Sequence, residues 1–211
     1  MAPLFSFLVS YLFTVAESIC VKGVESMDDS KIIELFFARS EEAISELDVK
    51  YGTLCTHIAT NILGNRDDAE ECVNDAYLGA WNTIPPQNPN PLKAYICKIV
   101  RNIAVTKYHA NTAQKRNSYY DIALDELENC LFSTETPDNA LQAKELSHLL
   151  DRFLAELDAR SRVIFVRRYW YADSVAVIAE QFHMRPNSVS VQLSRTRSKL
   201  RKFLIQEGYI L

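Results

Sequence analysis

Apolar residues recur every three or four positions along most of this 211-residue chain, and that spacing is what most limits its fold. An α-helix has about 3.6 residues per turn, so such spacing places apolar side chains on one helix face. Alternating runs rich in Val and Thr, which would predict strands, are scarce, and the chain holds only five glycines. We therefore predict an all-α fold, and hydrophobic residues, at 48%, suffice for a buried core.

Two helices are expected early in the chain. The first covers residues 44–62 and is well placed to end at Gly64, because glycine readily adopts the left-handed conformation of a helix cap. The second covers residues 67–82 and carries acidic residues in its first turn, where the helix dipole favours them. The proline-rich residues 85–91 must form a loop after it, because proline inside a helix removes a hydrogen bond.

A third helix is expected from Leu92 to about His109, with Lys98 and Arg101 pointing outward. Its expected buried residues are Leu92, Tyr95, Ile96, Ile99 and Ile103. Trp81 and Tyr95 both lie near the apolar side of their helices, so core packing competes with a binding role for each of them.

The polar, weakly periodic residues 111–139 indicate a flexible linker with one short helix between two small helical domains, residues 27–110 and residues 140–211. The helices expected in the second domain cover residues 141–157, 161–169, 174–182 and 187–204.

Residues 1–26 form an apolar extension outside both domains. Leu4 to Ala16 is almost continuously apolar, but no Lys or Arg precedes it as in a signal peptide. About 13 residues are also too few to span a membrane. A misassigned translation start is the favoured interpretation, because Met27-Asp28-Asp29 is an ordinary beginning for a cytosolic helical protein. A membrane-associated segment is the alternative.

The five cysteines are widely scattered and lack the paired spacing of a metal site. Cys55, Cys72 and Cys97 lie beside apolar helical positions, so we expect buried, reduced thiols, as in a cytoplasmic protein. We expect no metal and no cofactor. The sequence shows no Ser/His/Asp, metal or phosphate-loop pattern, so we also expect no catalytic residues and no enzyme activity.

Charge is distributed unevenly along the chain. Residues 1–151 carry 12 basic and 22 acidic side chains, a net of −10, whereas residues 152–202 carry 11 basic and 4 acidic ones, a net of +7. From Arg185 to Lys202 there are six basic residues and no acidic residue. A polyanion is therefore expected to bind the C-terminal third of the chain.

The last two expected helices have the layout of a helix-turn-helix, in which a support helix presents a longer helix to the DNA major groove. Ala179 is expected at the close crossing of the two helices, and His183-Met184-Arg185 is expected to form the turn. Pro186 is expected to open the recognition helix, because proline is tolerated in the first turn.

A projection at 100° per residue separates the faces of this recognition helix. The expected core face holds Val189, Leu193, Thr196, Leu200, Phe203 and Leu204. The opposite arc and its flanks hold Asn187, Ser188, Ser190, Val191, Gln192, Ser194, Arg195, Arg197, Ser198, Lys199, Arg201 and Lys202. Short polar residues let bases approach, while Arg and Lys suit phosphates and guanine edges. A solvated basic helix is the alternative, but the preceding support helix and turn favour DNA contact.

Residues 67–81, 92–104, 157–165 and 188–200 together resemble the extracytoplasmic-function (ECF) group of bacterial sigma factors. The first block is similar to the acidic-to-aromatic helix that docks on RNA polymerase, and the second is similar to the −10 element helix, with Arg-Asn-x-Ala intact. The last two blocks resemble the −35 domain. Both halves of the resemblance occur in the family's order and at its separation.

The sequence departs from the family pattern at several positions. Tyr95 stands where the family more often has Trp, and the loop of residues 85–91 has no basic residue, which leaves the −10 base preference open. In the support helix, Val177-Ile178-Ala179 lacks the usual Glu before Ile-Ala. His183 replaces the common glycine of the turn and is expected to carry strain if its backbone is left-handed.

The resemblance implies a non-enzymatic sigma factor that binds RNA polymerase core and reads promoter −10 and −35 elements. The implied core-polymerase-binding residues are Asp68, Glu71, Asn74, Asp75 and Leu78. The implied −10 DNA-binding residues are Lys93, Tyr95, Lys98, Arg101 and Asn102. The implied −35 DNA-binding residues are Arg185, Asn187, Ser188, Ser190, Val191, Gln192, Ser194, Arg195, Arg197 and Lys199.

The implied partners are RNA polymerase core and promoter DNA in the cytoplasm, nucleoid-associated in the holoenzyme, with no small-molecule substrate. An anti-sigma factor is left open as a further partner. Other functions explain less of the sequence. A helix-turn-helix regulator would assign no function to residues 27–110, and a helical adaptor that does not bind DNA would explain only the acidic half.

Overall fold

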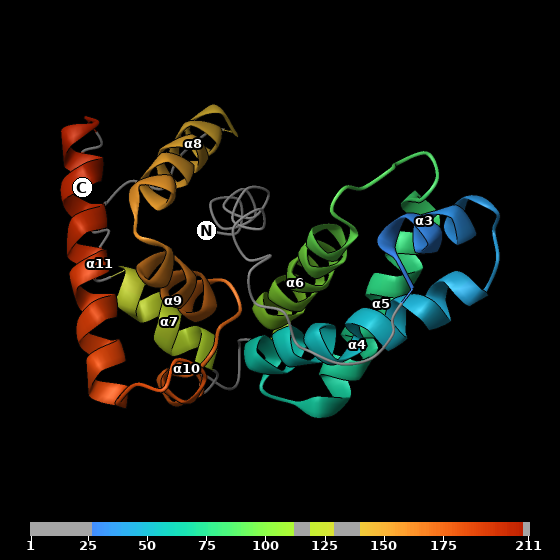
Figure 1. The fold of residues 1–211 in the computed structure, drawn as a ribbon, viewed down its shortest axis with the longest axis horizontal. Helices are drawn as coiled ribbons and strands as arrows, with labels where there is room; N and C mark the ends of the chain where they lie inside the picture. The colour runs from blue at the N-terminus through green and yellow to red at the C-terminus, as the bar shows by residue number, and fades with distance from the viewer. Residues whose placement is uncertain (1–26, 112–118, 129–139, 209–211) are drawn as a thin grey trace. The chain divides into compact units, whose positions relative to one another are not determined.

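A computed structural model describes residues 27–111, 119–128 and 140–208, which form α-helices without strands (Figure 1). The all-α fold class is therefore confirmed. The described residues fall into two compact units: an N-terminal unit of helices α3 to α6 and a C-terminal unit of helices α7 to α11. The expected structure of residues 1–26 lies outside the described residues.

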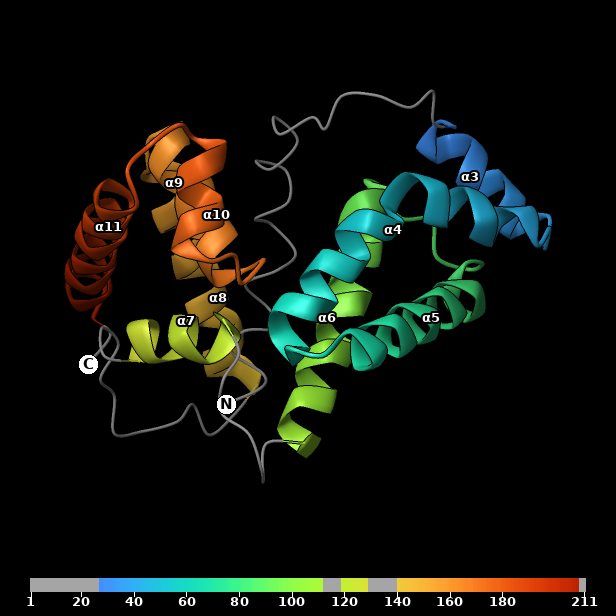
Figure 2. The ribbon, with the colours of Figure 1, turned by 90° about the horizontal axis from the view of Figure 1, so that it is seen from below.

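Helix α4 (Glu42–Leu63) is the centre of the N-terminal unit and packs against α3 (Asp29–Phe37), α5 (Arg66–Thr83) and α6 (Leu92–Asn111), as Figure 2 shows. The residues it buries are Ala43, Leu47, Tyr51, Gly52, Cys55, Ile58, Ala59 and Ile62. Ile44 and Leu54 are half-buried at the edge of this face. Gly64 ends the helix in the left-handed conformation, with φ of 68°, as predicted.

Helix α5 packs against both α4 and α6. Its first turn is capped by Asn65, whose side chain accepts a hydrogen bond of 3.2 Å from the Asp67 backbone N–H. Gly79 lies where α5 approaches α6, and a Cβ atom there would be 3.3 Å from Cγ2 of Ile99. A glycine at this position thus permits closer packing of the two helices than a larger residue would allow.

The buried face of α6 differs from the prediction. Arg101, which was expected outside, is only 2% exposed. Tyr95, Ile99 and Ile103 are half-buried rather than buried. The residues that α6 buries are Leu92, Ile96, Cys97, Val100, Arg101, Ala104 and Tyr108. The prediction was wrong because α6 contacts α3 as well as α4 and α5, so the buried face is set by three neighbours rather than by the densest apolar stripe.

Helix α3 was not predicted. It buries Ile32 and Phe36, which are four residues apart and therefore lie on one helix face. The Phe36 ring lies 6.1 Å from the half-buried ring of Trp81, so both aromatic residues contribute to packing in the N-terminal unit. The spacing of these two residues is the signal that would have found the helix.

The C-terminal unit contains α7 (Tyr119–Glu128), α8 (Ala140–Glu156), α9 (Ala159–Tyr169), α10 (Val175–Gln181) and α11 (Pro186–Gln206). Several aromatic rings meet in its core. The Phe153 ring lies 6.4 Å from that of Phe165 and 5.7 Å from that of Phe203, and the Phe165 and Tyr169 rings are 4.5 Å apart. Asp158 caps α9, since its side chain accepts a hydrogen bond from the Ser161 backbone N–H.

Helix α7 lies inside the segment expected to be a linker with one short helix, and it packs against α9 and buries Tyr120, Ala123 and Leu127. Among the described residues, the compact C-terminal unit therefore includes α7. The flexibility expected for the rest of residues 111–139 falls on positions outside the described residues.

Cys55, Cys72 and Cys97 are buried and free, as predicted, while Cys20 and Cys130 lie outside the described residues. The Cys72 thiol donates to the Val100 carbonyl oxygen at 3.4 Å, and burial raises the pKa of Cys72 to about 12. Within the described ranges, no helix is both long and apolar enough to cross a membrane.

Candidate nucleic-acid interface

Helices α10 and α11 form the expected helix-turn-helix. Ser174 caps α10, because its hydroxyl oxygen accepts a hydrogen bond of 3.2 Å from the Val177 backbone N–H. His183, in the turn, has φ of 51°, so the residue expected to carry strain is left-handed. Its N–H donates to the Glu180 carbonyl at 3.2 Å, and the Met184 N–H donates to the Ala179 carbonyl at 2.8 Å. These two bonds are those of a Schellman cap, a motif in which glycine is the usual left-handed residue.

Helix α11 begins with Pro186 in its first turn, as predicted, and has two distinct faces. The buried residues are Val189, Leu193, Thr196, Leu200 and Leu204, with Phe203 half-buried. The expected DNA-binding residues that the structure leaves exposed are Arg185, Asn187, Ser188, Ser190, Val191, Ser194, Arg195 and Lys199. A shallow depression against Ser161 of α9 is lined by several of these exposed side chains. The helix thus presents short polar side chains and cations to solvent.

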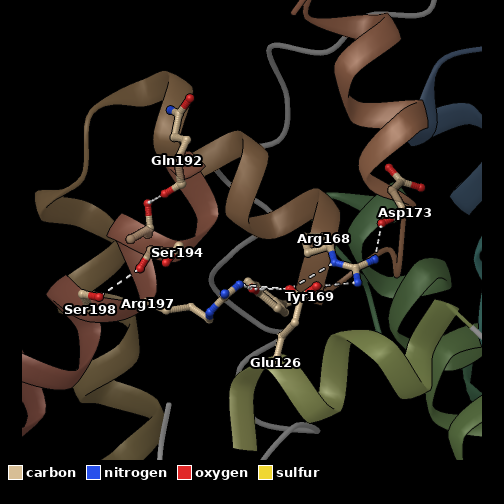
Figure 3. A network of polar contacts seen from close by, with 9 residues as sticks. Glu126, Arg168, Tyr169, Asp173, Gln192, Ser194, Arg197 and Ser198 are labelled. Atoms are coloured by element: carbon tan, nitrogen blue, oxygen red, sulfur yellow. Dashed lines mark hydrogen bonds and ion pairs between the residues drawn. The ribbon is translucent and has the colours of Figure 1, made fainter. Parts of the chain in front are cut away.

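Two of the ten predicted −35 residues, Gln192 and Arg197, are instead half-buried and bonded within the unit. The Gln192 amide nitrogen donates to the Ser161 hydroxyl at 3.0 Å. Nη1 of Arg197 donates to the Tyr169 hydroxyl at 2.6 Å and to Oε2 of Glu126 at 2.9 Å (Figure 3). Both side chains therefore connect α11 to other helices of the unit.

Glu126 of α7 was not predicted to have any role. Its Oε1 accepts a hydrogen bond of 2.9 Å from Nη2 of Arg168, and its Oε2 accepts one of 2.9 Å from the Tyr169 hydroxyl. Burial, followed by the charge of Glu126, raises the pKa of Tyr169, although Arg197 opposes this effect. Glu126 and its partners are more than 40 residues apart in sequence, so no local pattern predicts their contacts. The apolar spacing of Tyr120, Ala123 and Leu127 could have predicted helix α7, but not the role of Glu126.

The expected core-polymerase-binding residues lie together on α5. Glu71, Asn74, Asp75 and Leu78 are exposed, and the apolar side chain of Leu78 is 57% exposed. Asp68 is half-buried. Nζ of Lys107 on α6 lies 3.2 Å from Oδ1 of Asp68 and 2.5 Å from Oε2 of Glu71. The hydrogen bond to Glu71, the largest favourable influence, raises the pKa of Lys107, so this end of the acidic face is partly neutralised.

The five expected −10 residues do not form one exposed strip. Lys93, Tyr95, Lys98 and Asn102 are half-buried, and the buried Arg101 does not point outward as expected. The Tyr95 hydroxyl donates to Oγ1 of Thr83 at 2.7 Å and so connects α6 to the end of α5.

A groove beside these residues was also missed by the sequence reasoning. Its lining residues are Asp29, Ser30, Ile33, Glu34, Phe37, Asn88, Pro89, Asn90 and Leu92. The groove therefore joins α3, which was not predicted, to the proline-rich loop, which was. In the part of the chain that the structure describes, no group of three His, Cys, Asp or Glu side chains is arranged to hold a metal ion.

The fold and the exposed arc of α11 define a helical protein with a helix-turn-helix domain. The family model for Sigma-70 region 2 matches residues 47–113, and the model for Sigma-70, region 4 matches residues 147–200. Together these matches cover more than half of the chain, which belongs to the sigma-70 family of transcription initiation factors. It directs promoter recognition, and its partners are RNA polymerase core and promoter DNA.

Comparison with solved structures gives a match to a structure described as CnrH in complex with the cytosolic domain of CnrY. The match has 18% sequence identity and a TM-score of 0.40, and it covers 84% of this chain and 97% of that chain. No curated protein sequence matches the chain.

Proposed function

We propose that this chain is an ECF-group sigma factor of the cytoplasm, whose α11 reads the −35 element and whose α5 docks on polymerase core. The observation that carries the proposal is the division of α11 into a buried apolar face and an exposed polar arc, directly after a support helix and turn. It acts without catalysis of its own, by holding the polymerase at particular DNA sequences.

The exposed residues of α11 suit readout of a duplex. Asn187, Ser188 and Ser190 lie in the first turns, where short side chains allow the helix to approach base edges. Arg195 follows on the exposed arc and can reach a guanine edge, while Lys199 and later cations suit phosphates. We expect Arg195→Ala to change the base preference at one −35 position, and Lys202→Ala to weaken binding to all sequences alike.

The exposed face of α5 suits a partner that is basic around an apolar centre. Leu78 is exposed about one turn after Asp75, and charge complementarity around a buried apolar residue is a common plan for protein interfaces. An anti-sigma factor that covers this face would compete with polymerase core, and such a partner stays a prediction.

For the −10 element, we propose that the groove between α3 and the proline-rich loop accepts an unstacked base of the melted strand. Its lining offers amide groups of Asn88 and Asn90 and apolar surface from Ile33 and Phe37, which together suit hydrogen bonding to a base edge and contact with its face. Lys93 and Lys98 are the cations that remain for backbone phosphates, since Arg101 is buried.

Transcription of genomic DNA by purified polymerase core, with and without this protein, tests the proposed function. We expect new start sites only when the protein is present, with shared sequences near −10 and −35. Start sites that do not change would contradict promoter recognition by this chain.

A charge-reversed variant, Glu71→Arg with Asp75→Arg, tests the docking face. We expect it to lose co-purification with core while staying folded, because both side chains are exposed. The variant Glu41→Arg with Glu42→Arg is a matched control, since it changes the charge equally at two other exposed positions of the same unit. Equal core binding by both variants would exclude the α5 face.

A further inference from the structure

One carboxylate, that of Glu126, joins three helices of the C-terminal unit. It accepts hydrogen bonds from Arg168 and Tyr169 of α9 and from Arg197 of α11, each at 2.9 Å. Figure 3 shows Glu126 extending from α7 between the two arginines. Arg168 also donates to the Asp173 carbonyl at 2.9 Å, which connects the network to the segment that leads into α10.

The network is not a loose surface cluster. Arg168 is 2% exposed and Tyr169 is 4% exposed, and the side chains of Glu126 and Arg197 are 25% and 21% exposed. Hydrogen bonds in which both partners are charged are stronger than neutral ones, and a low local dielectric strengthens them further. Without the carboxylate, the guanidinium groups of Arg168 and Arg197 would lose the negative charge that both contact.

The network includes the helix proposed to read DNA. Arg195 is exposed on the outer arc of α11, whereas Arg197, two residues later, is turned toward α7 and α9. The Arg197 guanidinium, on the flank of the recognition helix, is therefore bonded to residues of the same unit. Two hydrogen bonds of 2.6 Å and 2.9 Å hold it there.

We infer that Glu126 is a positioning residue for promoter recognition: by anchoring Arg197 and Arg168, it fixes the recognition helix α11 against α9. This rests on the proposed function, in which α11 reads the −35 element. It makes α7 a working part of the DNA-reading unit, and it makes Arg197 an anchor rather than a DNA contact. An alternative is a latch, in which α7 withholds Arg197 from DNA until it is released.

The variant Glu126→Gln tests this inference through the sign of its effect. Removing a negative charge from a DNA-binding unit should by itself strengthen DNA binding. The matched control is Asp125→Asn, which removes an exposed carboxylate from the neighbouring position of the same helix. Promoter binding is measured with holoenzyme made from full-length protein and polymerase core, on a promoter found by start-site mapping and on a library randomised at −35.

For Glu126→Gln we expect about a 5- to 30-fold loss of −35 affinity, together with weaker discrimination across the library, since an interaction of 1–2 kcal/mol corresponds to that change. For Asp125→Asn we expect unchanged or slightly tighter binding. Equal behaviour of the two variants would show that the network does not position α11. Binding by Glu126→Gln that is tighter than that of Asp125→Asn would overturn the inference in favour of a latch.

Two further measurements separate positioning from loss of folding. Glu126→Asp keeps the charge on a shorter side chain and should recover part of the affinity. If Arg197 acts only as an anchor, Glu126→Gln with Arg197→Met should bind no worse than either single variant, whereas an additional loss would mark Arg197 as a DNA contact.

Amide hydrogen exchange of α11 in the free protein should rise in Glu126→Gln and stay unchanged in Asp125→Asn. This readout does not depend on promoter binding. Wild-type holoenzyme without any −35 preference would contradict the proposed function, whereas unchanged exchange in α11 would contradict the inference about Glu126.

Discussion

The two units of this sigma factor achieve their helix packing differently. In the N-terminal unit, α4, α5 and α6 have 22, 18 and 20 residues, and they meet mainly through apolar side chains and buried thiols, with Arg101 as the buried charged residue of its described part. In the C-terminal unit, α10 has only seven residues, and Arg168, Asp173 and Thr196 are buried. Short helices offer little apolar surface for fixing their orientation, so polar contacts gain importance there. We expect the loss of one charge to lower the unfolding free energy more in the C-terminal unit. In the N-terminal unit, we expect adding or removing one buried atom to have the larger effect.

The largest effect is expected for Arg168→Met. It removes a cation that is 2% exposed and leaves the Glu126 carboxylate and the Asp173 carbonyl without this donor. Breaking a buried charge pair from one side costs about 3–5 kcal/mol of unfolding free energy, which chemical denaturation of the full chain measures. Arg160→Met, at an exposed position of the same helix, should cost less than about 0.5 kcal/mol. Similar losses in both variants would contradict the role given to buried charge.

Gly52→Ala is expected to have the next largest effect. A Cβ atom at Gly52 would overlap Oδ1 of Asp48, which accepts the 2.7 Å hydrogen bond of the Tyr77 hydroxyl. We expect a loss of about 1–3 kcal/mol, although alanine normally stabilises a helix relative to glycine by about 1 kcal/mol. In an Asp48→Ala background the clash is absent, so the same substitution should become stabilising in denaturation measurements. The same sign in both backgrounds would exclude the clash.

Alkaline pH should weaken the N-terminal unit through Cys72. Its pKa is raised from 9.0 to about 12 in the folded chain, so the folded thiol keeps its proton after the unfolded chain has lost it. Stability is then fully present below pH 9 and falls between pH 9 and pH 12, by about 1.4 kcal/mol at pH 10. Denaturation at pH 8 and pH 10 should show this extra loss in wild type relative to Cys72→Ala. An equal loss in the two proteins would contradict the assignment.

The smallest effects concern two of the left-handed residues that follow helices, Gly64 after α4 and His183 after α10. His183→Gly should stabilise the protein by about 0.5–1 kcal/mol, because the left-handed backbone costs a non-glycine residue about 1–2 kcal/mol and glycine loses part of that gain through chain entropy. Gly64→Ala should destabilise it by about 1 kcal/mol for the same reason. The Tm of the two variants should therefore shift in opposite directions relative to wild type. Shifts in the same direction would contradict the role given to the left-handed backbone.

Sequence reasoning worked best where one helix determined the outcome. The buried face of α11, the cap at Gly64 and the turn at His183 follow from local spacing and backbone preferences, and the structure has all three. It failed where several helices meet. Periodicity assigns a cation such as Arg101 to the outside, but in the structure it is 2% exposed, on a helix that packs against three others. Glu126 has partners 42 to 71 residues away, and no local pattern reports such distances.

The close approach of α5 and α6 at Gly79 has a consequence for the spacing of the two surfaces proposed on these helices. The proposed polymerase-docking face lies on α5, and Lys93 and Lys98, proposed to hold −10 phosphates, lie on α6. A side chain at Gly79 would act as a wedge against Ile99 and change the spacing between these two surfaces. The absence of one methyl group thus helps to set the distance between the proposed polymerase-docking surface and the surface proposed to hold −10 phosphates.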